Sequence, residues 1–158
     1  MKKIINPWAG EPTYHCYGCC PSSHHGLRME FYEDGDQIVS HWTPREEFQG
    51  WRNTLHGGIQ ATLADEIASW VVFRKFQTSG VTSKLEARYM KPILISDGEI
   101  TLRAAVTRQA RNLVEISVSI FNHAGEEATK VTCLYFLFPK DKAREEFGFM
   151  EFKTEDEL

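Results

Sequence analysis

The chain has 158 residues, a length that suits one domain with a core of useful size. Its composition, 42% apolar and 25% charged, is that of an ordinary soluble globular protein. The net charge of −4 argues against general nucleic-acid binding, which needs a basic surface. No apolar run is long enough to cross a membrane, and no secretory leader follows the first lysines. We therefore expect a cytoplasmic protein with no membrane association, whose four cysteines are reduced thiols.

The predicted elements begin after an irregular segment, residues 1–26, which is rich in proline and glycine. Leu27–Phe31 alternates apolar and charged residues with the period of a strand, and Gln37–Trp42 resumes a strand after a turn at Gly35. Residues 56–76 are the only long helix candidate. Two apolar stripes run along different sides of this helix, so we expect it to be buried on more than one side.

Four further segments read as strands: Val81–Met90, Glu99–Ala110, Leu113–Asn122 and Glu127–Phe138. One long helix with about six mostly antiparallel strands is an α+β plan, in which a strongly curved sheet wraps around the helix. Strands at the edge of such a sheet need cover, and dimerisation is one way to supply it. We interpret residues 1–158 as a single domain that ends in an acidic tail, residues 140–158, whose last dozen residues we expect to be loosely ordered.

The predicted helix opens with His56-Gly57-Gly58. Backbone N–H groups at a helix start lack partners within the helix, and the helix dipole places partial positive charge there. Glycines let a ligand come close to those groups, so this start is a candidate oxyanion or anion site. The same three residues are also typical of an ordinary loop before a helix, with the histidine as the helix cap.

Asp65 lies in one of the apolar stripes, where a buried carboxylate needs a partner or a function. Its neighbour Glu66 is expected to face solvent. Asp65 follows His56 by nine residues, about 13 Å along a helix, so it is too far to act on a group held at its own helix start. A partner subunit packed antiparallel would place its own Asp65 beside this subunit's Gly57.

Three stretches carry a family resemblance: NTLHGGIQATLAD, VTSKLEARYMKP and CYGCCPSSHHGLRMEF. They resemble the hotdog-fold acyl-CoA thioesterases, in the PaaI-like branch of the 4-hydroxybenzoyl-CoA thioesterase type. The likeness runs from Cys16 to about Phe138. It departs from the usual pattern at Cys19-Cys20, where many members have Cys-Gly, and at Ser23-His24, where many have Asn-Pro.

The resemblance implies a hotdog fold, a homodimer or dimer of dimers, and hydrolysis of an acyl-CoA thioester without a cofactor, CoA being part of the substrate. It implies that Asp65 is the general base or the nucleophile. The N–H of Gly57 would polarise the thioester carbonyl, and His56 and Asn53 would help to position the carbonyl and the water. A hydroxyl residue early in the next strand, Thr82 or else Ser83, would assist.

Residues 74–111 hold eight basic and three acidic side chains, an excess that suits the phosphates of CoA or simply a solvated strand surface. The candidate phosphate-binding residues are Arg88, Lys91, Arg108 and Arg111. Candidates for the neighbourhood of the acyl pocket are Trp51, Ile59 and Trp70, each of which could equally belong to the core.

Two other interpretations stay open. A zinc site could use Cys16 and Cys19 with Cys20, His24 or His25, but the histidines follow unusually closely for a finger, and we favour no metal. The chain could also be a non-catalytic acyl-CoA-binding or regulatory hotdog protein, although the intact His56, Gly57 and Asp65 argue against that. A hotdog dehydratase would use a different local pattern, and none matches.

Overall fold

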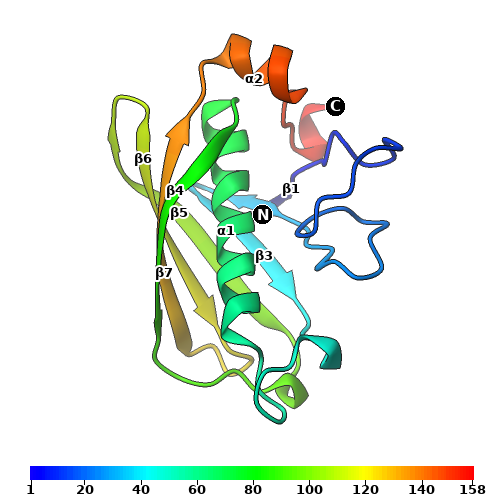
Figure 1. The fold of residues 1–158 in the computed structure, drawn as a ribbon, viewed down its shortest axis with the longest axis vertical. Coiled ribbons are helices and arrows are strands. Elements are labelled where there is room, and N and C mark those ends of the chain that lie inside the picture. Colours follow the sequence, from blue (N-terminus) through cyan, green and yellow to red (C-terminus); the bar gives the residue numbers. More distant parts are fainter.

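A computed structural model describes residues 1–158 as a seven-stranded antiparallel sheet with one long helix packed against it (Figure 1). The strand order is β1-β2-β3-β5-β6-β7-β4. The strands are β1 (Lys2–Lys3), β2 (Tyr32–Asp34), β3 (Gln37–Trp42), β4 (Gly80–Tyr89), β5 (Ile100–Ala110), β6 (Leu113–Phe121) and β7 (Glu127–Leu137). The helices are α1 (Gly57–Phe76) and α2 (Lys140–Phe147), with 3-10 turns η1 (Glu46–Phe48), η2 (Ile95–Asp97) and η3 (Glu155–Glu157).

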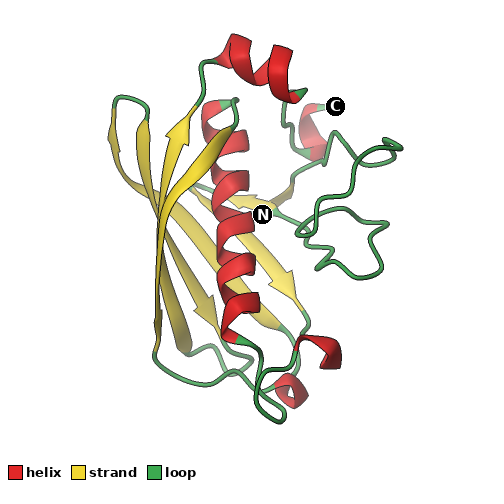
Figure 2. Cartoon of the chain, viewed as in Figure 1, coloured by secondary structure: helices red, strands yellow, loops and turns green.

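Helix α1 confirms the predicted helix to within one residue and is buried on more than one side, as its two stripes require. It begins where the ring of His56 accepts a hydrogen bond from the N–H of Gly58, and it ends at Gln77 in the left-handed region, at φ 49°. Strands β3 to β7 contact the helix. The curved sheet around a single long helix is the predicted hotdog architecture, seen by element type in Figure 2.

The four strands after the helix lie within one residue of their predicted bounds. The prediction for Leu27–Phe31 was wrong as to hydrogen bonding, although its apolar side chains are buried as the alternation indicated. The N–H groups of Leu27 and Met29 donate to the carbonyls of Tyr17 and Gly18, not to a neighbouring strand. Arg28 has φ 51°, which interrupts an extended chain, and the first hairpin strand therefore starts only at Tyr32.

Strand β4 forms one edge of the sheet and pairs only with β7. Its register shifts between Thr82 and Lys84, a β-bulge that places one extra residue in the strand. Because side chains alternate between faces, the extra residue lets both Thr82 and Tyr89 point toward α1 although they are seven positions apart. Val81 on β4 and Met90, the residue after its end, are exposed apolar side chains.

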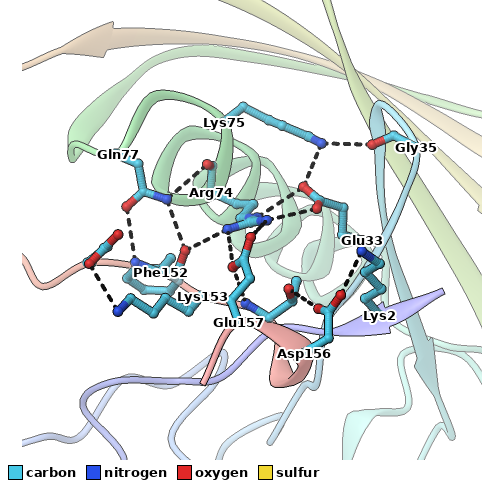
Figure 3. Close-up of polar contacts among 12 residues, drawn as sticks. Lys2, Glu33, Gly35, Arg74, Lys75, Gln77, Phe152, Lys153, Asp156 and Glu157 are labelled. Carbon is cyan, nitrogen blue, oxygen red and sulfur yellow. Dashed lines mark hydrogen bonds and ion pairs between the residues drawn. The ribbon is translucent and has the colours of Figure 1, made fainter.

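The acidic tail is ordered, contrary to the prediction for its last dozen residues. Phe149 and Phe152 are buried against Trp8 and Phe73, on the side of α1 that the sheet leaves open. Arg74 on α1 holds the tail through hydrogen bonds and ion pairs, shown in Figure 3. Its guanidinium donates to Glu33 at 2.9 and 3.0 Å, to Glu157 at 2.9 and 3.0 Å, and to the carbonyl of Phe152 at 2.9 Å. Acidic residues in the tail are therefore bound to cations and not simply solvated.

Glu66 was also wrongly predicted, because it does not face solvent. The N-terminal segment, whose lack of regular structure is otherwise largely confirmed, covers this side of α1 and brings Cys16 within 3.4 Å of the Glu66 carboxylate. Burial raises the pKa of Glu66 to about 8.

All four cysteines are free thiols. Neither helix has the length and apolar character needed to cross a bilayer.

Candidate active site

Asp65 projects from the middle of α1 toward β4 and β7, where two hydroxyl groups hold its carboxylate. The Thr82 hydroxyl donates to Oδ1 at 2.6 Å, and the Tyr135 hydroxyl donates to the same oxygen at 2.7 Å. Both donors bind one oxygen, so the other, Oδ2, accepts no hydrogen bond from the protein. Asp65 is partly buried and Thr82 is exposed, which leaves the carboxylate open toward the free edge of β4.

Tyr135 is the site residue that sequence reasoning missed. Its side chain is 3% exposed, and its hydroxyl also donates to the Asp65 carbonyl at 2.7 Å. Burial and the nearby Asp65 charge raise the pKa of Tyr135, which therefore remains a donor at neutral pH. The same two causes raise the pKa of Cys133, two residues earlier on β7, to about 12. Asp65 thus sits over neutral hydrogen-bond donors and a neutral thiol.

The start of α1 forms the second group of site residues. His56 Nδ1 accepts from the Gly58 N–H at 2.9 Å, so the neutral ring carries its proton on the exposed Nε2. Gly57 is the first helical residue, and its N–H has no partner within the helix. The Tyr89 hydroxyl donates to the Gly57 carbonyl at 2.6 Å, which fixes the helix start against the end of β4.

A cavity of about 760 Å³ opens beside this helix start. His56, Gly57 and Gln60 form its inner wall. Its remaining lining residues are Gln49, Gly50, Trp51, Thr54, Leu55, Tyr89, Met90, Lys91 and Pro92. The lining includes two hydrogen-bond donors, the Gly57 N–H and His56 Nε2, together with apolar side chains such as Leu55, a combination that suits a ligand with one polar group and an apolar chain.

Asn53 does not point into this cavity. Its side-chain amide donates to Ser96 at 2.8 Å and accepts from the Ser96 N–H at 3.0 Å. With φ at 56°, Asn53 forms the left-handed turn that ties the loop before α1 to η2. It supports the loop that carries His56, and it lines a separate depression with Arg52 and Ser96.

The four candidate phosphate-binding residues do not form one patch within a protomer. Lys91 lines the cavity and binds Glu126 at 2.5 Å, whereas Arg88 lies on β4 and is not among the lining residues. Arg108 pairs with Glu115 at 3.5 Å, and Arg111 occupies the β5–β6 turn at the opposite end of the sheet (Figure 1). Through the strand registers, Arg108 on β5 lies level with Lys84 on β4, which is four residues before Arg88. The two arginines are therefore separated by about 13 Å in the direction of the strands.

The three candidates for the acyl pocket also separate. Trp51 is 85% exposed and lines the cavity beside His56. Ile59 lines a neighbouring hollow on the other side of the histidine. Trp70 is a core residue, 1% exposed and stacked on Phe31 with ring centroids 4.2 Å apart.

Asp65 and Gly57 belong to the same helix and are eight residues apart, about 12 Å along its axis. The described protomer therefore holds two separate candidate half-sites: a carboxylate with its hydroxyl donors, and a helix start with its cavity. One reacting carbonyl cannot reach both halves of the same protomer.

Comparison with known proteins identifies the family. The family model for the thioesterase superfamily matches residues 52–129, a segment that contains the helix start, Asp65 and Thr82. The chain belongs to the thioesterase superfamily. Tyr135 lies outside the matched segment, on the strand that completes the site.

Among curated relatives of this superfamily member, a Schizosaccharomyces pombe protein is 34% identical over 65 residues, which is 40% of this chain and 37% of that protein. Acyl-coenzyme A thioesterase 13 of Homo sapiens is 29% identical over 89 residues, 56% of this chain and 63% of that enzyme. The matches thus span less than two thirds of the length of these relatives.

Solved structures agree with the hotdog fold. A hypothetical thioesterase protein of Streptococcus pneumoniae, crystallised with coenzyme A, superposes with a TM-score of 0.65 at 24% identity, over 71% of this chain and 87% of that one. Two more structures of that streptococcal protein carry alanine in place of an aspartate and of a threonine, respectively.

Proposed function

We propose that this protein hydrolyses acyl-CoA thioesters to a free acid and CoA. The observation that carries the proposal is the Asp65 carboxylate, held on one oxygen by Thr82 and Tyr135 and open on the other. Membership of the thioesterase superfamily, the acyl-CoA thioesterase among its relatives, and the streptococcal neighbour crystallised with coenzyme A support the same substrate class.

The active site would be shared across a homodimer. If β4 pairs antiparallel with β4 of a second protomer, the free edges of both strands are satisfied and the two α1 helices run in opposite directions. A two-fold axis midway between Thr82 and Tyr89 places Thr82 opposite the partner's Tyr89. Asp65 of one protomer then approaches the partner's Gly57, which unites the two half-sites described above.

In this arrangement, Oδ2 of Asp65 removes a proton from a water molecule as the water oxygen attacks the thioester carbon. The carbonyl oxygen gains negative charge, which the partner's Gly57 stabilises through its backbone N–H. The partner's His56 can add a second hydrogen bond from Nε2. When the carbon–sulfur bond breaks, the electron pair leaves with sulfur, and the proton from Asp65 neutralises the thiolate.

Direct attack by Asp65 on the thioester, with release of the thiolate and formation of an anhydride, uses the same groups. A single turnover in ¹⁸O-labelled water identifies the anhydride route when the label enters Asp65. General-base hydrolysis places the label in the released acid, whereas hydrolysis of an anhydride at the enzyme carbonyl places it in Asp65. Mass spectrometry of the product and of the tryptic peptide locates the label.

The first experiment is a thiol-release assay over short, medium, long and aromatic acyl-CoAs, with Asp65→Asn beside the wild type. Turnover that is lost in the variant, while acyl-CoA binding persists, supports the proposal. A folded dimeric wild type that binds acyl-CoA but never releases thiol would instead be a non-catalytic acyl-CoA-binding protein.

Mixing two inactive variants tests the shared site. Asp65→Asn and Gly57→Pro protomers that exchange subunits should form heterodimers with one intact half-site pair, and roughly one quarter of the active sites should return. Recovery of no activity after verified exchange would contradict the shared site, while the thiol-release result for the wild type would still stand.

A further inference from the structure

On the side of α1 that faces away from the sheet, Cys16, Cys19 and Glu66 converge. One ligand-capable atom from each residue lies within 4.8 Å of the other two. Cys16 Sγ is 3.4 Å from Glu66 Oε1. Glu66 follows Asp65 in sequence, but its side chain points to the N-terminal segment and takes no part in the site described above.

The distance between Cys16 and Glu66 is that of two metal ligands, and the other two distances in the cluster are at most 4.8 Å. With zinc–sulfur bonds near 2.3 Å and zinc–oxygen bonds near 2.1 Å, tetrahedral angles place two sulfurs about 3.8 Å apart and sulfur about 3.6 Å from oxygen. The observed 3.4 Å between Cys16 Sγ and Glu66 Oε1 is close to the second value. Two thiols and a carboxylate in this arrangement are a donor set that zinc accepts.

The loop between the two cysteines is built to approach Glu66. A Cβ on Gly18 would lie 2.4 Å from Cδ of Glu66, so a side chain at this position would displace the carboxylate from its present place against the loop. The N–H of Cys20 donates to the Cys16 carbonyl at 3.1 Å, which closes the turn. The Gly18 carbonyl in turn accepts from the Met29 N–H at 2.9 Å.

Surrounding groups orient the three side chains. Trp70 Nε1–H donates to Glu66 Oε1 at 3.3 Å. The Tyr14 hydroxyl lies 2.7 Å from Cys19 Sγ, and Asn6 donates to that hydroxyl at 3.1 Å, which leaves the hydroxyl proton available for the sulfur. Hydrogen bonds of this kind orient metal ligands and tune their basicity. The hydrogen-bond partners of the Glu66 carboxylate include no cationic side chain.

The residues that the sequence offered as alternatives are placed elsewhere. Cys20 Sγ donates to the Tyr14 carbonyl at 3.3 Å and lies near Ser22, so it is turned away from the cluster. His24 and His25 are not part of it. The third ligand is therefore Glu66, fifty residues beyond Cys16, which no local spacing rule could identify.

We propose that Cys16, Cys19 and Glu66 bind one zinc ion, with the fourth position taken by water on the side where Cys16 is only partly buried. The ion fastens the N-terminal segment to α1. Zinc binding displaces the thiol protons of Cys16 and Cys19, so both bind the ion as thiolates. Glu66 binds it as an ionised carboxylate. The inference is independent of the thioesterase activity.

The test uses the full-length protein, kept reduced, stripped with a chelator and titrated with Zn²⁺ against a coloured competing chelator. Titration with Co²⁺ gives a second readout, because thiolate ligation produces a sulfur-to-cobalt charge-transfer band. We expect one equivalent of zinc and a clear charge-transfer band. Cys16→Ser and Cys19→Ser should each weaken zinc binding by more than about 100-fold, and Glu66→Gln and Tyr14→Phe by about 10-fold or more.

Cys20→Ser is the matched control, since it changes a thiol in the same loop outside the cluster, and it should bind zinc as the wild type does. Wild-type protein also provides a readout without any variant: zinc should protect Cys16 from alkylation, as followed by mass spectrometry. Absence of the charge-transfer band, equal affinity in Cys16→Ser or Glu66→Gln, unprotected alkylation of Cys16, or a Cys16–Cys19 disulfide that persists in reductant would each overturn the proposal.

Discussion

Replacing Gly57 by proline removes one N–H group and leaves the rest of the helix start in place. Proline is favoured at the first helical position because its nitrogen needs no partner there. The residue before a proline must be extended, and His56 already has φ −58° and ψ 132°. A Cβ at position 57 would lie 3.4 Å from the Tyr89 ring, an ordinary contact. The fold should therefore accept Gly57→Pro.

The magnitude follows from the role of that N–H. Loss of one donor to the developing oxyanion costs about 100- to 1,000-fold in kcat, or roughly 2.7–4 kcal/mol of transition-state stabilisation. KM should change little, because the donor acts on charge that appears only in the transition state. The measurement is steady-state thiol release on the best acyl-CoA, with circular dichroism and the melting temperature as checks on folding.

Gly57→Ala is the control, because it adds the same Cβ and keeps the N–H. It should retain most of the wild-type kcat. If Gly57→Pro is folded and as active as Gly57→Ala, the Gly57 N–H is not the oxyanion donor, and the reasoning from the helix start fails.

Three further predictions concern other contacts. Tyr135→Phe removes a donor to Asp65 but leaves Thr82, so kcat should fall about 10-fold. Tyr32→Phe, in the β2–β3 hairpin, is the control and should not change kcat. An unaltered kcat in Tyr135→Phe would contradict the positioning role. Gly80→Ala would place a Cβ 2.4 Å from the Phe136 carbonyl oxygen and should destabilise the fold by about 1–3 kcal/mol, measured by chemical denaturation; an unchanged midpoint would refute the clash. Arg74 and Lys75 hold the pKa of Glu33 below its ordinary value, so their stabilisation is present above the unfolded pKa of about 4.3 and is lost as pH falls through the folded value; the melting-temperature gap between wild type and Arg74→Gln should narrow from pH about 6 to about 3, and a constant gap would argue against the ion pair.

Periodicity was sufficient to predict α1 and the four strands after it, because each is long and its apolar residues recur with the period of a helix or of a strand. It failed where a segment finds its partners far away in the sequence. Leu27–Phe31 alternates like a strand, yet its N–H groups bind the N-terminal loop. The tail looks solvated, yet Phe149 and Phe152 reach the open side of α1 and Arg74 neutralises part of its charge.

The candidate site divides in the same way. Asp65, Gly57 and Thr82 were predicted from a family motif, and the structure places Thr82 on Asp65 and Gly57 at the helix start. Tyr135 was not predicted, because an aromatic residue at an inward position of a buried strand is typical of the core. Only the fold brings its hydroxyl to Asp65. The bulge near Thr82 was equally hidden, since one extra residue leaves no mark in the amino-acid pattern.

The two ends of the chain close the side of α1 that the sheet leaves open, with Ile4 bridging to Thr154 and Trp8 packed against Phe152. During synthesis, residues 1–26 leave the ribosome long before Phe152 and cannot complete their packing until it has followed. The sheet and α1 can assemble earlier, with an apolar helix face still exposed to water. Nascent chains stalled before position 149 should therefore be the species that a chaperone recognises, and fusing the nearby termini with a short linker should let a circularly permuted chain close that face sooner.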